Sequence, residues 1–373
     1  MKLRILLTGG GTGGHIYPLI AVAEELRRIS AERNRELELR YFGVPGDFEG
    51  ILEAQNIRVS KILNAKLRRY LDPRNLLDVP KFFISFIQSL IKIFFFMPDV
   101  IFSKGGPGAL AIVLAARFYR IPVMIHDSDA VPGITSQISS KFAERVAISF
   151  EGAGDYLFGS LALTGNPIRP ELLKDIPDTE TAKTIMGFSS SKPLILFING
   201  SQGATRVNDF ILDTAKELLH DFQILHQTGK HNFEAVRTEL EIAGREFSAE
   251  EKQNYKIAPY FDDNIKTAYA AAEVIVSRAG SGSIFEIAAF GKPSILIPLP
   301  EAADQPKNAY AYEKAGAAIV VEAENLTPNI LIHELKKITS DPVRKEAMSV
   351  AAKKFSKPDA AKLIAEEILK LIN

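Results

Sequence analysis

The sequence predicts an α/β protein with two Rossmann-like, doubly wound parallel-sheet domains that face each other across a cleft. Three observations support this fold class. Short apolar strands alternate with helical stretches along the chain, a pattern typical of parallel sheets. Glycine-rich turns follow several of the strands, as in nucleotide-binding α/β folds. The length of 373 residues is enough for two domains of ordinary size.

The first half of the chain opens with a strand, a glycine turn, a helix and a second strand. The expected elements are a strand at 3–7, a glycine-rich turn at 9–14, a helix at 18–29, a strand at 37–42, a helix at 48–55, a strand at 57–62, a long apolar helix after Pro80 and a strand at 100–103. This alternation predicts a first domain over residues 1–163.

The second half of the chain repeats this architecture. Residues 194–198 form an apolar run that leads into a glycine-containing turn at 199–203. A closer repeat relates residues 99–108 (DVIFSKGGPG) to residues 273–282 (EVIVSRAGSG), with one acid, one apolar strand, one cation and one glycine turn in each. The repeat predicts a second Rossmann-like domain over residues 164–356.

The connection between the two domains and the end of the chain have their own signals. Residues 164–170 contain two prolines and a Gly-Asn pair, which interrupt regular structure and indicate a linker. After a Lys-Pro pair, Asp359 can cap a final amphipathic helix that runs through Ile372. We expect this last segment, residues 357–373, to pack back on the N-terminal domain.

Composition narrows the class of function and of site. Lys and Arg together number 45, as do Asp and Glu, so the chain lacks the basic excess of a nucleic-acid binder. It contains no cysteine, which excludes disulfides, thiolate metal sites and a cysteine nucleophile and suits a reducing compartment. The N-terminal apolar stretch is about five residues long, shorter than a signal peptide requires. We therefore expect a cytoplasmic protein.

The glycine turns are the places where ligands are expected. They follow strands, and in an open parallel sheet the carboxyl ends of the strands form the ligand-binding edge. Glycine lets the backbone approach a phosphate closely, and the helix that follows offers unpaired N–H groups and a partial positive charge. Two facing sets of such turns suit two diphosphates.

Neither of two common nucleotide-binding motifs, the dinucleotide-binding glycine pattern and the ATP-binding P-loop, is complete in this sequence. Gly9, Gly11 and Gly14 satisfy the pattern G-x-G-x-x-G, but no Asp or Glu ends the second strand, where a nicotinamide enzyme holds the ribose. The sequence also lacks GK[ST], which excludes an ATP-hydrolysing P-loop. We expect no cofactor.

Two polar groups at the glycine turns are candidates for catalysis. His15 ends the first glycine turn at the start of a helix, where the helix dipole disfavours the imidazolium, so that the neutral ring can act as a general base; a packed or capping histidine is the alternative. Residues 126–129 (HDSD) contain a D-x-D pattern that can hold a divalent cation. No other carboxylates accompany this pair, so substrate hydroxyls are the expected partners, with helix capping by Asp129 as the alternative.

An apolar run at residues 82–97 indicates a membrane-surface patch. It contains twelve apolar residues, fewer than the ~20 that a membrane span needs. Because packing on a sheet uses one face of a helix, the remaining apolar side chains should be exposed near basic residues. The patch would comprise Phe82, Phe83, Phe86, Phe94, Lys66, Arg68 and Arg69. A helix buried on both sides is the alternative.

Six motifs in order give the chain a resemblance to a known family. The motifs are residues 9–15 (GGGTGGH), 103–106 (SKGG), 126–133 (HDSDAVPG), 165–169 (GNPIR), 200–203 (GSQG) and 277–286 (SRAGSGSIFE). In these motifs the chain resembles the MurG-type N-acetylglucosaminyltransferases of peptidoglycan synthesis, glycosyltransferase family 28, which have the twin-Rossmann GT-B fold. The likeness spans nearly the whole chain.

The resemblance implies a specific reaction. N-acetylglucosamine (GlcNAc) would pass from UDP-GlcNAc to the C4 hydroxyl of MurNAc on undecaprenyl-pyrophosphoryl-MurNAc-pentapeptide (lipid I). The product would be lipid II, formed with inversion and without a required metal. The protein would lie at the cytoplasmic face of the membrane as a peripheral protein, where other cell-wall synthesis proteins are possible partners.

The resemblance also implies roles for individual residues. The residues expected at UDP-GlcNAc are Thr12, Gly13, Gly14, Asp129, Arg169, Ser201, Gln202, Phe261, Ser283, Glu286 and Gln305. Among these, Glu286 would bind the ribose hydroxyls, and Arg169 would stabilise the departing UDP. The residues expected at the acceptor pyrophosphate are Gly10, Gly11, Gly105 and Gly106, with Thr12 and His15 beside them. His15, or alternatively Asp127, would remove the acceptor proton.

Three other functions share parts of this pattern. The same fold can serve a transferase with another acceptor or a UDP-sugar epimerase, which needs no acceptor. A binding subunit without catalytic activity that tethers wall-synthesis proteins would not require His15 and Glu286. An oxidoreductase is the least favoured, because the ribose-binding acid is missing.

Overall fold

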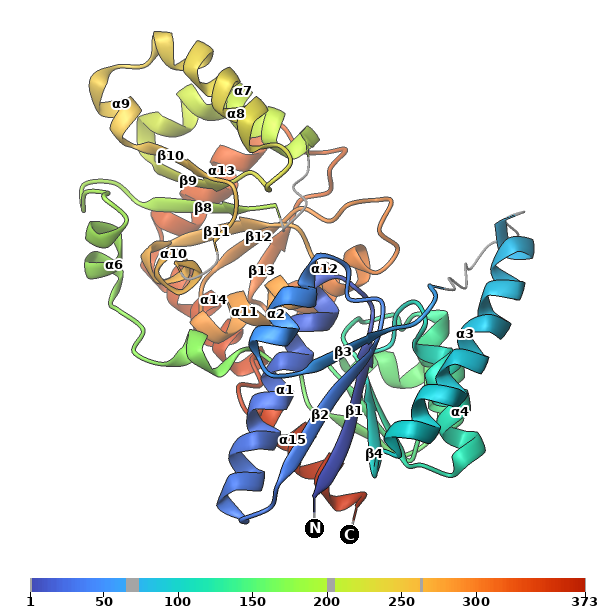
Figure 1. Cartoon of the computed structure of the whole chain (residues 1–373). Coiled ribbons are helices and arrows are strands. Elements are labelled where there is room, and N and C mark those ends of the chain that lie inside the picture. Colours follow the sequence, from blue (N-terminus) through green and yellow to red (C-terminus); the bar gives the residue numbers. More distant parts are fainter. Residues whose placement is uncertain (1, 65–73, 200–204, 262–263, 373) are drawn as a thin grey trace. The chain divides into compact units, whose positions relative to one another are not determined.

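The computed structural model of the protein describes residues 2–64, 74–199, 205–261 and 264–372. The chain forms two compact units (Figure 1). Unit 1 comprises Met1–Arg169 together with Lys357–Asn373, and unit 2 comprises Pro170–Ser356. The chain therefore leaves unit 1 once and returns to it for its last helix.

Unit 1 is built on a parallel sheet that contains seven strands in the described part of the chain. Their order is β3-β2-β1-β4-β5-β6-β7. The strands are β1 (Leu3–Gly9), β2 (Leu37–Gly43), β3 (Arg58–Lys61), β4 (Val100–Ser103), β5 (Val123–Asp127), β6 (Arg145–Ile148) and β7 (Leu161–Leu163). β4 and β5 are buried at every position, as expected for strands covered on both faces.

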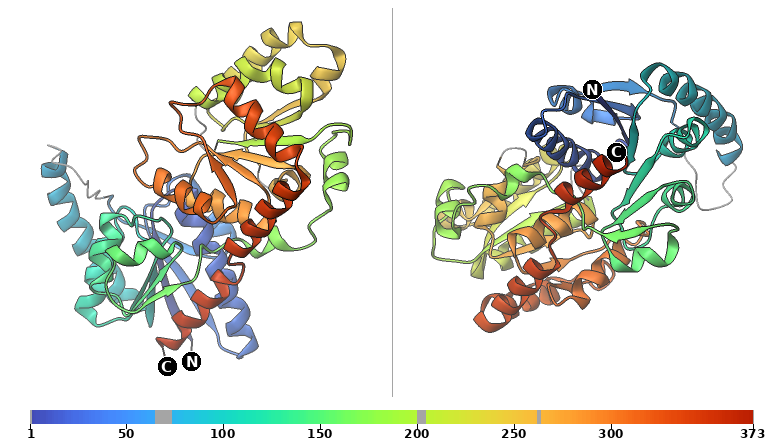
Figure 2. Two further views of the ribbon diagram at one scale, coloured as in Figure 1. Left: turned by 180° about the vertical axis from the view of Figure 1, so that it is seen from behind. Right: turned by 90° about the horizontal axis from the view of Figure 1, so that it is seen from below.

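Helices cover both faces of this sheet. They are α1 (Gly13–Glu32), α2 (Glu49–Ala54), α3 (Arg74–Phe96), α4 (Ala109–Tyr119), α5 (Ile134–Ser140) and α15 (Ala360–Lys370), with short 3-10 turns η1 (Gly46–Phe48) and η2 (Glu151–Tyr156). On one face, α1 and α15 pack side by side (Figure 2). Leu26 of α1 and Ile364 of α15 enter a common core with β1. On the other face, Ile93 of α3 and Ile112 of α4 enter a second core. Unit 1 is thus doubly wound.

Unit 2 repeats this plan with a six-stranded parallel sheet in its described residues. The order is β10-β9-β8-β11-β12-β13. The strands are β8 (Leu194–Ile198), β9 (Gln223–Gln227), β10 (Tyr255–Ala258), β11 (Val274–Ser277), β12 (Ser294–Leu296) and β13 (Ala318–Val320). The helices are α6 (Thr179–Ile185), α7 (Thr205–Asp221), α8 (Phe233–Ala243), α9 (Ala249–Gln253), α10 (Ile265–Ala271), α11 (Ser281–Phe290), α12 (Gln305–Lys314), α13 (Pro328–Thr339) and α14 (Pro342–Phe355), with 3-10 turns η3 (Pro170–Leu173) and η4 (Gly244–Glu246).

The predicted fold class of two parallel-sheet α/β domains is confirmed, and the internal repeat has a structural meaning. β4 pairs with β1, and β11 pairs with β8, so the two repeated segments occupy equivalent places in their sheets. The glycine turns that follow β4 and β11 therefore stand beside the first strand of each unit. This is the edge where the sequence places ligands.

The starts of two helices differ from the sequence-based expectation. The expected starts are Pro18 and the residue after Pro80, yet α1 begins at Gly13 and α3 at Arg74, so both prolines lie inside helices. Each proline lacks one backbone N–H donor. In α1, Ile16 precedes Pro18 and is fully buried, and we attribute the earlier start to this packing. Asp359 is the N-cap residue of α15, but its side chain makes no capping hydrogen bond.

Candidate active site

The first glycine turn of unit 1 is packed too tightly for side chains. It connects β1 to α1, and a Cβ atom on Gly11 would lie 2.5 Å from the carbonyl oxygen of Val44. Gly106, in the turn after β4, has φ +84°, and its Cβ would lie 2.8 Å from the Gly10 nitrogen. Two of the turns predicted to bind pyrophosphate are therefore in direct contact, and glycine is required in both.

His15 lies between these two turns. A Cβ on Gly10 would lie 3.1 Å from His15 Nδ1, and one on Gly106 would lie 3.1 Å from His15 Nε2. His15 Nδ1 is 2.8 Å from Thr12 Oγ1, so an Nδ1–H group that donates to Thr12 leaves Nε2 free to accept a proton. Burial, and then the charge of Lys104, lowers the pKa of His15 to about 4. The imidazole is therefore neutral at pH 7, as a general base requires.

A buried polar cluster lies at the ends of β4 and β5. Lys104 Nζ donates to His126 Nδ1 at 2.6 Å and to Ser128 Oγ, and it lies 3.4 Å from Asn166 Oδ1. His126 Nε2 lies 2.9 Å from the carbonyl oxygen of Gly165. Burial lowers the pKa of Lys104 to about 8, although the carboxylates of Asp127 and Asp129 oppose this effect. The cluster ties residues 103–105 and 126–128 to the segment that leaves unit 1.

The two carboxylates of the HDSD motif have different surroundings. Asp127 is buried, and burial raises the pKa of its carboxyl group. Hydrogen bonds from Ser136 and from the N–H groups of Asp129 and Gly133 lower this pKa, but by less than burial raises it. Asp129 is half-buried, and the N-cap residue of α5 is Gly133 rather than Asp129. Among the described residues, no group of three or more His, Asp or Glu side chains is placed to hold a metal ion.

Arg169 ends unit 1 and lies against the first helix. Its guanidinium carbon is 4.4 Å from the centre of the Tyr17 ring on α1, a cation–π geometry. Arg169 Nε is buried and has no hydrogen-bond partner among the described residues. The stacking holds the guanidinium against Tyr17, which lies in the first turns of α1 and follows Thr12 and His15 in the sequence.

In unit 2 the predicted nucleotide residues lie on β10–α11 and at α12. Glu286 Oε2 accepts a hydrogen bond of 2.8 Å from Tyr269 Oη, and Ser283 is half-buried one turn earlier on α11. Phe261 is buried, and its N–H donates to Gln227 Oε1 at 3.2 Å. Gln305 Oε1 accepts from the N–H of Leu299 at 3.1 Å, so this side chain supports the loop after β12. Ser201 and Gln202 lie outside the described residues.

Three residues without a role in the sequence analysis belong to these clusters. Lys104 is the first. Arg278 Nη1 donates to the carbonyl oxygen of Asn199 at 3.4 Å and joins the turns after β8 and β11. His226 is buried at the end of β9, where Nδ1 is 3.0 Å from Tyr255 Oη and Nε2 is 3.0 Å from Asn208 Oδ1. Polar residues at the ends of otherwise apolar strands are the signal that could have found all three.

The predicted membrane patch is partly exposed on α3. Phe83 is 60% and Phe94 57% exposed, whereas Phe82 and Phe86 are half-buried and Phe86 packs against the core of unit 1. The other large apolar side chains exposed on and beside α3 are Val79, Ile84, Ile87, Ile91, Phe95, Met97 and Phe118. The alternative of a helix buried on both sides is therefore wrong. The basic residues Lys66, Arg68 and Arg69 lie outside the described part of the chain.

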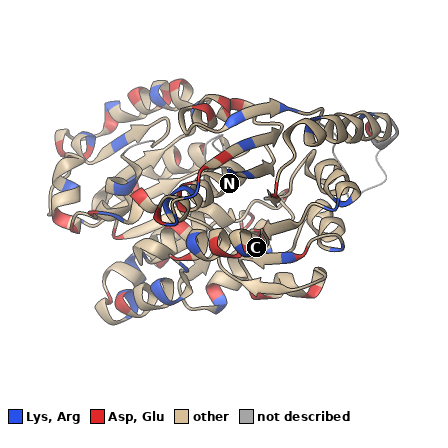
Figure 3. Cartoon of the chain, turned by 60° about the horizontal axis from the view of Figure 1, so that its bottom comes forward, with Lys and Arg blue, Asp and Glu red and all other residues tan. Residues whose placement is uncertain are grey.

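The length of α3 differs from the expectation. The helix has 23 residues, and its ribbon carries few charged residues (Figure 3). Among the described residues, the segment Asp78–Phe96 is long and apolar enough to cross a membrane by length and composition, so the length-based exclusion of a span is wrong. Apolar core helices meet the same criterion, and α3 contributes Ile93 and Phe96 to the core of unit 1.

Comparison with known proteins gives matches along the whole chain. The model of the glycosyltransferase family 28 N-terminal domain matches residues 5–148, and that of the C-terminal domain matches residues 194–364. A Bacillus anthracis protein is 34% identical over 370 residues, which cover 98% of this chain and 99% of the relative. It is named UDP-N-acetylglucosamine--N-acetylmuramyl-(pentapeptide) pyrophosphoryl-undecaprenol N-acetylglucosamine transferase 2. A Clostridium tetani transferase with the same name, without the final number, is 34% identical over 340 residues, 90% of this chain and 89% of the relative.

Solved structures match the fold at lower identity. MurG of Acinetobacter baumannii has a TM-score of 0.75 and 24% identity, with 99% of each chain covered. UDP-GlcNAc 2-epimerase of Neisseria meningitidis has a TM-score of 0.69 and 16% identity, with 99% of this chain and 100% of that chain covered. The fold is thus shared by transferases and epimerases, while the full-length identity is to the named transferases. The chain therefore belongs to glycosyltransferase family 28, among the MurG-type N-acetylglucosaminyltransferases.

Proposed function

We propose that this enzyme transfers GlcNAc from UDP-GlcNAc to the C4 hydroxyl of MurNAc on lipid I, with inversion, and so forms lipid II. The observation that carries the proposal is a neutral His15, oriented by Thr12 and enclosed by two glycine turns at the ends of β1 and β4. The full-length identity to transferases named for this reaction supports the same conclusion.

The mechanism is a direct displacement. His15 Nε2 accepts the proton of the acceptor hydroxyl as its oxygen attacks the anomeric carbon of GlcNAc, and the bond from that carbon to the UDP oxygen breaks. Backbone N–H groups of the turn at Gly10 and Gly11 and of the turn at Gly105 and Gly106 bind the acceptor's pyrophosphate. The guanidinium of Arg169 stabilises the negative charge on the departing UDP.

The donor contacts are assigned residue by residue. Glu286 accepts hydrogen bonds from the ribose hydroxyls, and Phe261 borders the uracil. The remaining contacts to UDP-GlcNAc are assigned to Thr12, Gly13, Gly14, Asp129, Ser201, Gln202, Ser283 and Gln305. The buried Asp127 is the alternative base, because its raised pKa also permits proton transfer.

The decisive experiment supplies UDP-GlcNAc with or without a short-chain lipid I analogue. We expect UDP release and a disaccharide product only when the acceptor is present, and inversion is checked by NMR of the new anomeric linkage. An epimerase would instead convert UDP-GlcNAc alone, and a non-catalytic binding subunit would form no product. Kinetics of His15→Ala and Asp127→Asn then assign the base, because only loss of the base should remove most of kcat.

We also propose that the exposed apolar face of α3 rests on the cytoplasmic membrane surface. Phe83 and Phe94 carry this proposal, because each exposes more than half of its side chain on a helix of few charges. Each inserted Phe should contribute about 1.5–3 kcal/mol to binding. Co-sedimentation with anionic lipid vesicles tests this. The double variant Phe83→Ser, Phe94→Ser should lose most binding, whereas Ile242→Ser, Val343→Ser, which changes exposed residues of unit 2, should retain it.

A further inference from the structure

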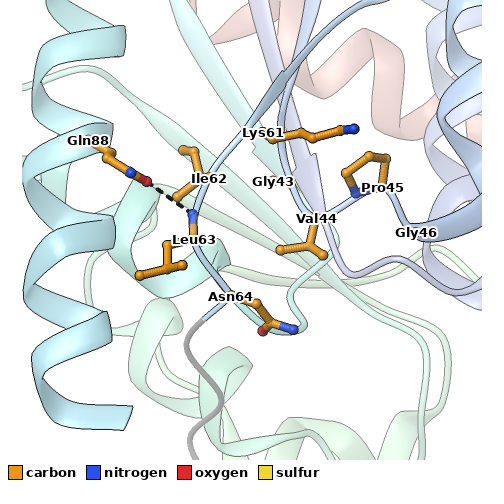
Figure 4. Close-up of a pocket in the computed structure, with 9 residues that line it drawn as sticks. All are labelled: Gly43, Val44, Pro45, Gly46, Lys61, Ile62, Leu63, Asn64 and Gln88. Atoms are coloured by element: carbon orange, nitrogen blue, oxygen red, sulfur yellow. Dashed lines mark hydrogen bonds between the residues drawn. The ribbon is translucent and has the colours of Figure 1, made fainter. Parts of the chain in front are cut away.

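A cavity of about 490 Å³ in unit 1 is not used by the proposed reaction. It lies at the carboxyl ends of β2 and β3, between the segments 43–46 and 61–64, and Gln88 of α3 forms its outer side (Figure 4). This volume is in the range of small-molecule binding sites. The carboxyl edge of a parallel sheet is also where ligands are expected.

One wall of the cavity is the outer side of the pyrophosphate turns. A Cβ on Gly11 would lie 2.5 Å from the carbonyl oxygen of Val44, which lines the cavity. A Cβ on Gly108, in the turn after β4, would lie 3.9 Å from the carbonyl oxygen of Leu63 and 4.0 Å from Val44 Cγ2. The cavity is therefore directly adjacent to both glycine turns assigned to the acceptor's pyrophosphate.

The opposite wall leads to the apolar face of α3. Gln88 Oε1 accepts a hydrogen bond of 3.0 Å from the N–H of Leu63, which fixes the segment after β3 to the helix (Figure 4). Ile84 and Ile91 stand four residues before and three residues after Gln88, so they share its side of the helix. They are 49% and 52% exposed. Exposed apolar surface thus continues from the cavity along α3.

The lining itself suits an apolar ligand. Val44, Pro45, Ile62 and Leu63 contribute apolar side chains. Two of the polar lining residues, Lys61 and Gln88, already have polar partners. Lys61 forms an ion pair of 2.6 Å with Glu49, and the Gln88 oxygen is used by Leu63. A hydrocarbon in this cavity would cover apolar surface without displacing these interactions.

We propose that this cavity holds the first isoprene units of the acceptor's polyprenyl chain. The proposal rests on the proposed function, in which an apolar chain is joined directly to a pyrophosphate held by the glycine turns. Such a chain must leave the turns and reach the membrane. The cavity lies between the turns and the exposed face of α3, and its apolar lining gives the chain a path between them.

Calorimetry with geranyl pyrophosphate and with inorganic pyrophosphate tests the cavity without turnover. Wild type should bind geranyl pyrophosphate at least about tenfold more tightly, because several buried methylene groups contribute to binding. Leu63→Ser should lose most of this preference, and Leu63→Met should keep it. Ile51→Ser is the matched control, since Ile51 on α2 and Leu63 are both 37% exposed and Ile51 lies outside the cavity lining.

Turnover gives a second, independent measurement. With MurNAc-pentapeptide acceptors of one, two and four isoprene units, kcat/KM should rise with chain length in wild type and Ile51→Ser but not in Leu63→Ser. Equal affinity for the two pyrophosphates in wild type, or the same preference in Leu63→Ser, overturns the proposal. Prenyl-selective binding without disaccharide formation from any acceptor would instead contradict the proposed reaction and leave the cavity assignment standing.

Discussion

The side-chain nitrogen of Lys104 lies 2.6 Å from Nδ1 of His126, and both side chains are buried in unit 1. Because the ammonium can only donate, Nδ1 must accept, and Nε2 then carries the proton and donates to the carbonyl oxygen of Gly165 at 2.9 Å. Lys104 thus fixes the tautomer of His126. Through His126 it holds the segment that leads to Arg169, so Lys104 is a positioning residue for the end of unit 1.

The burial of Lys104 predicts a specific dependence of stability on pH. Its pKa is about 8 in the folded protein, against an ordinary value of 10.5 for a lysine side chain. Between these values the unfolded chain binds a proton that the folded protein has released, so the free energy of unfolding should rise with pH. Relative to Lys104→Met, wild type should gain on the order of 3 kcal/mol between pH 7.5 and pH 10.5. Urea denaturation of both proteins measures this difference, and a flat difference would contradict the assignment.

The pKa of His15 predicts the acid limb of the pH–rate profile. Because burial and Lys104 lower this pKa to about 4, the base stays unprotonated well below pH 6.5. We expect kcat/KM to fall only as the pH approaches about 4, provided that the protein remains folded, which circular dichroism monitors. His15→Gln should lower kcat by about 10²–10⁴, the usual contribution of a general base. A full-activity His15→Gln enzyme would exclude His15 as the base.

Thr12 should influence catalysis through His15. Thr12→Val removes the oxygen that lies 2.8 Å from His15 Nδ1, while Thr12→Ser keeps it. Loss of one orienting hydrogen bond should lower kcat about tenfold, and the serine variant should stay near wild type. The KM for UDP-GlcNAc of the two variants separates this effect from a direct role of Thr12 in donor binding. A raised KM with unchanged kcat would favour the direct role.

Gly106 should not tolerate any side chain. Gly106→Ala would place Cβ 2.8 Å from the Gly10 nitrogen on a backbone with φ +84°, so the two turns must separate. We expect a loss of about 1–3 kcal/mol in the free energy of unfolding and a larger loss of activity than of stability. Gly152→Ala is the control, because a Cβ there meets no atom within 4 Å. Denaturation and steady-state kinetics of both variants provide the comparison.

The sheet register explains which site residues could be predicted from the sequence. Glycine turns after apolar strands were predictable, because buried parallel strands are almost continuously apolar and their ends meet at one edge. The pairing of Lys104 with His126 was not, because it depends on which strands are neighbours. Ser103 of β4 pairs with Ile125 of β5, so the residues that follow them, Lys104 and His126, lie side by side. Only the strand order turns two separate motifs into one cluster.

The predicted starts of α1 and α3 were wrong for a related reason. The apolar pattern predicts one helix from Pro18 and another after Pro80, whereas both prolines lie inside helices. Ile16, which precedes Pro18, is fully buried on the sheet. Tertiary packing of this kind is invisible to a local sequence pattern. The same limit applies to the polar partners of Glu286, because Tyr269 lies 17 residues away on another helix.

Glu286 and Tyr269 predict how the donor site responds to mutation. Glu286→Gln should raise the KM for UDP-GlcNAc about tenfold or more, because a charged hydrogen-bond acceptor of the ribose is lost. Tyr269→Phe should raise this KM less, since it removes the 2.8 Å hydrogen bond that orients Glu286 but leaves the carboxylate in place. Glu324→Gln, an exposed change in the same unit, is the control. Steady-state kinetics with varied UDP-GlcNAc test the order of effects, and an unchanged KM in Glu286→Gln would contradict the ribose assignment.

The buried His226 network predicts a coupling between residues on different strands. His226 Nδ1 accepts from Tyr255 Oη, and Nε2 donates to Asn208 Oδ1, which also accepts from Asn199 Nδ2 at 2.6 Å. His226→Phe leaves Tyr255 and Asn208 without this partner and should cost about 1–3 kcal/mol in the free energy of unfolding. In a Tyr255→Phe background the same change should cost less, because one of the two groups is already absent.

The pH dependence of His226 gives a test that loss of packing alone would not produce. Burial lowers the pKa of His226 to about 3, so between pH 6.5 and about 3 the unfolded chain binds a proton that the folded protein does not. Wild type should therefore lose stability relative to His226→Phe as the pH falls below 6.5. Denaturant titrations at pH 7.5 and pH 5 measure the difference. A constant difference would mean that His226 is protonated alike in both states, and the hydrogen bonds to Tyr255 and Asn208 would need another assignment.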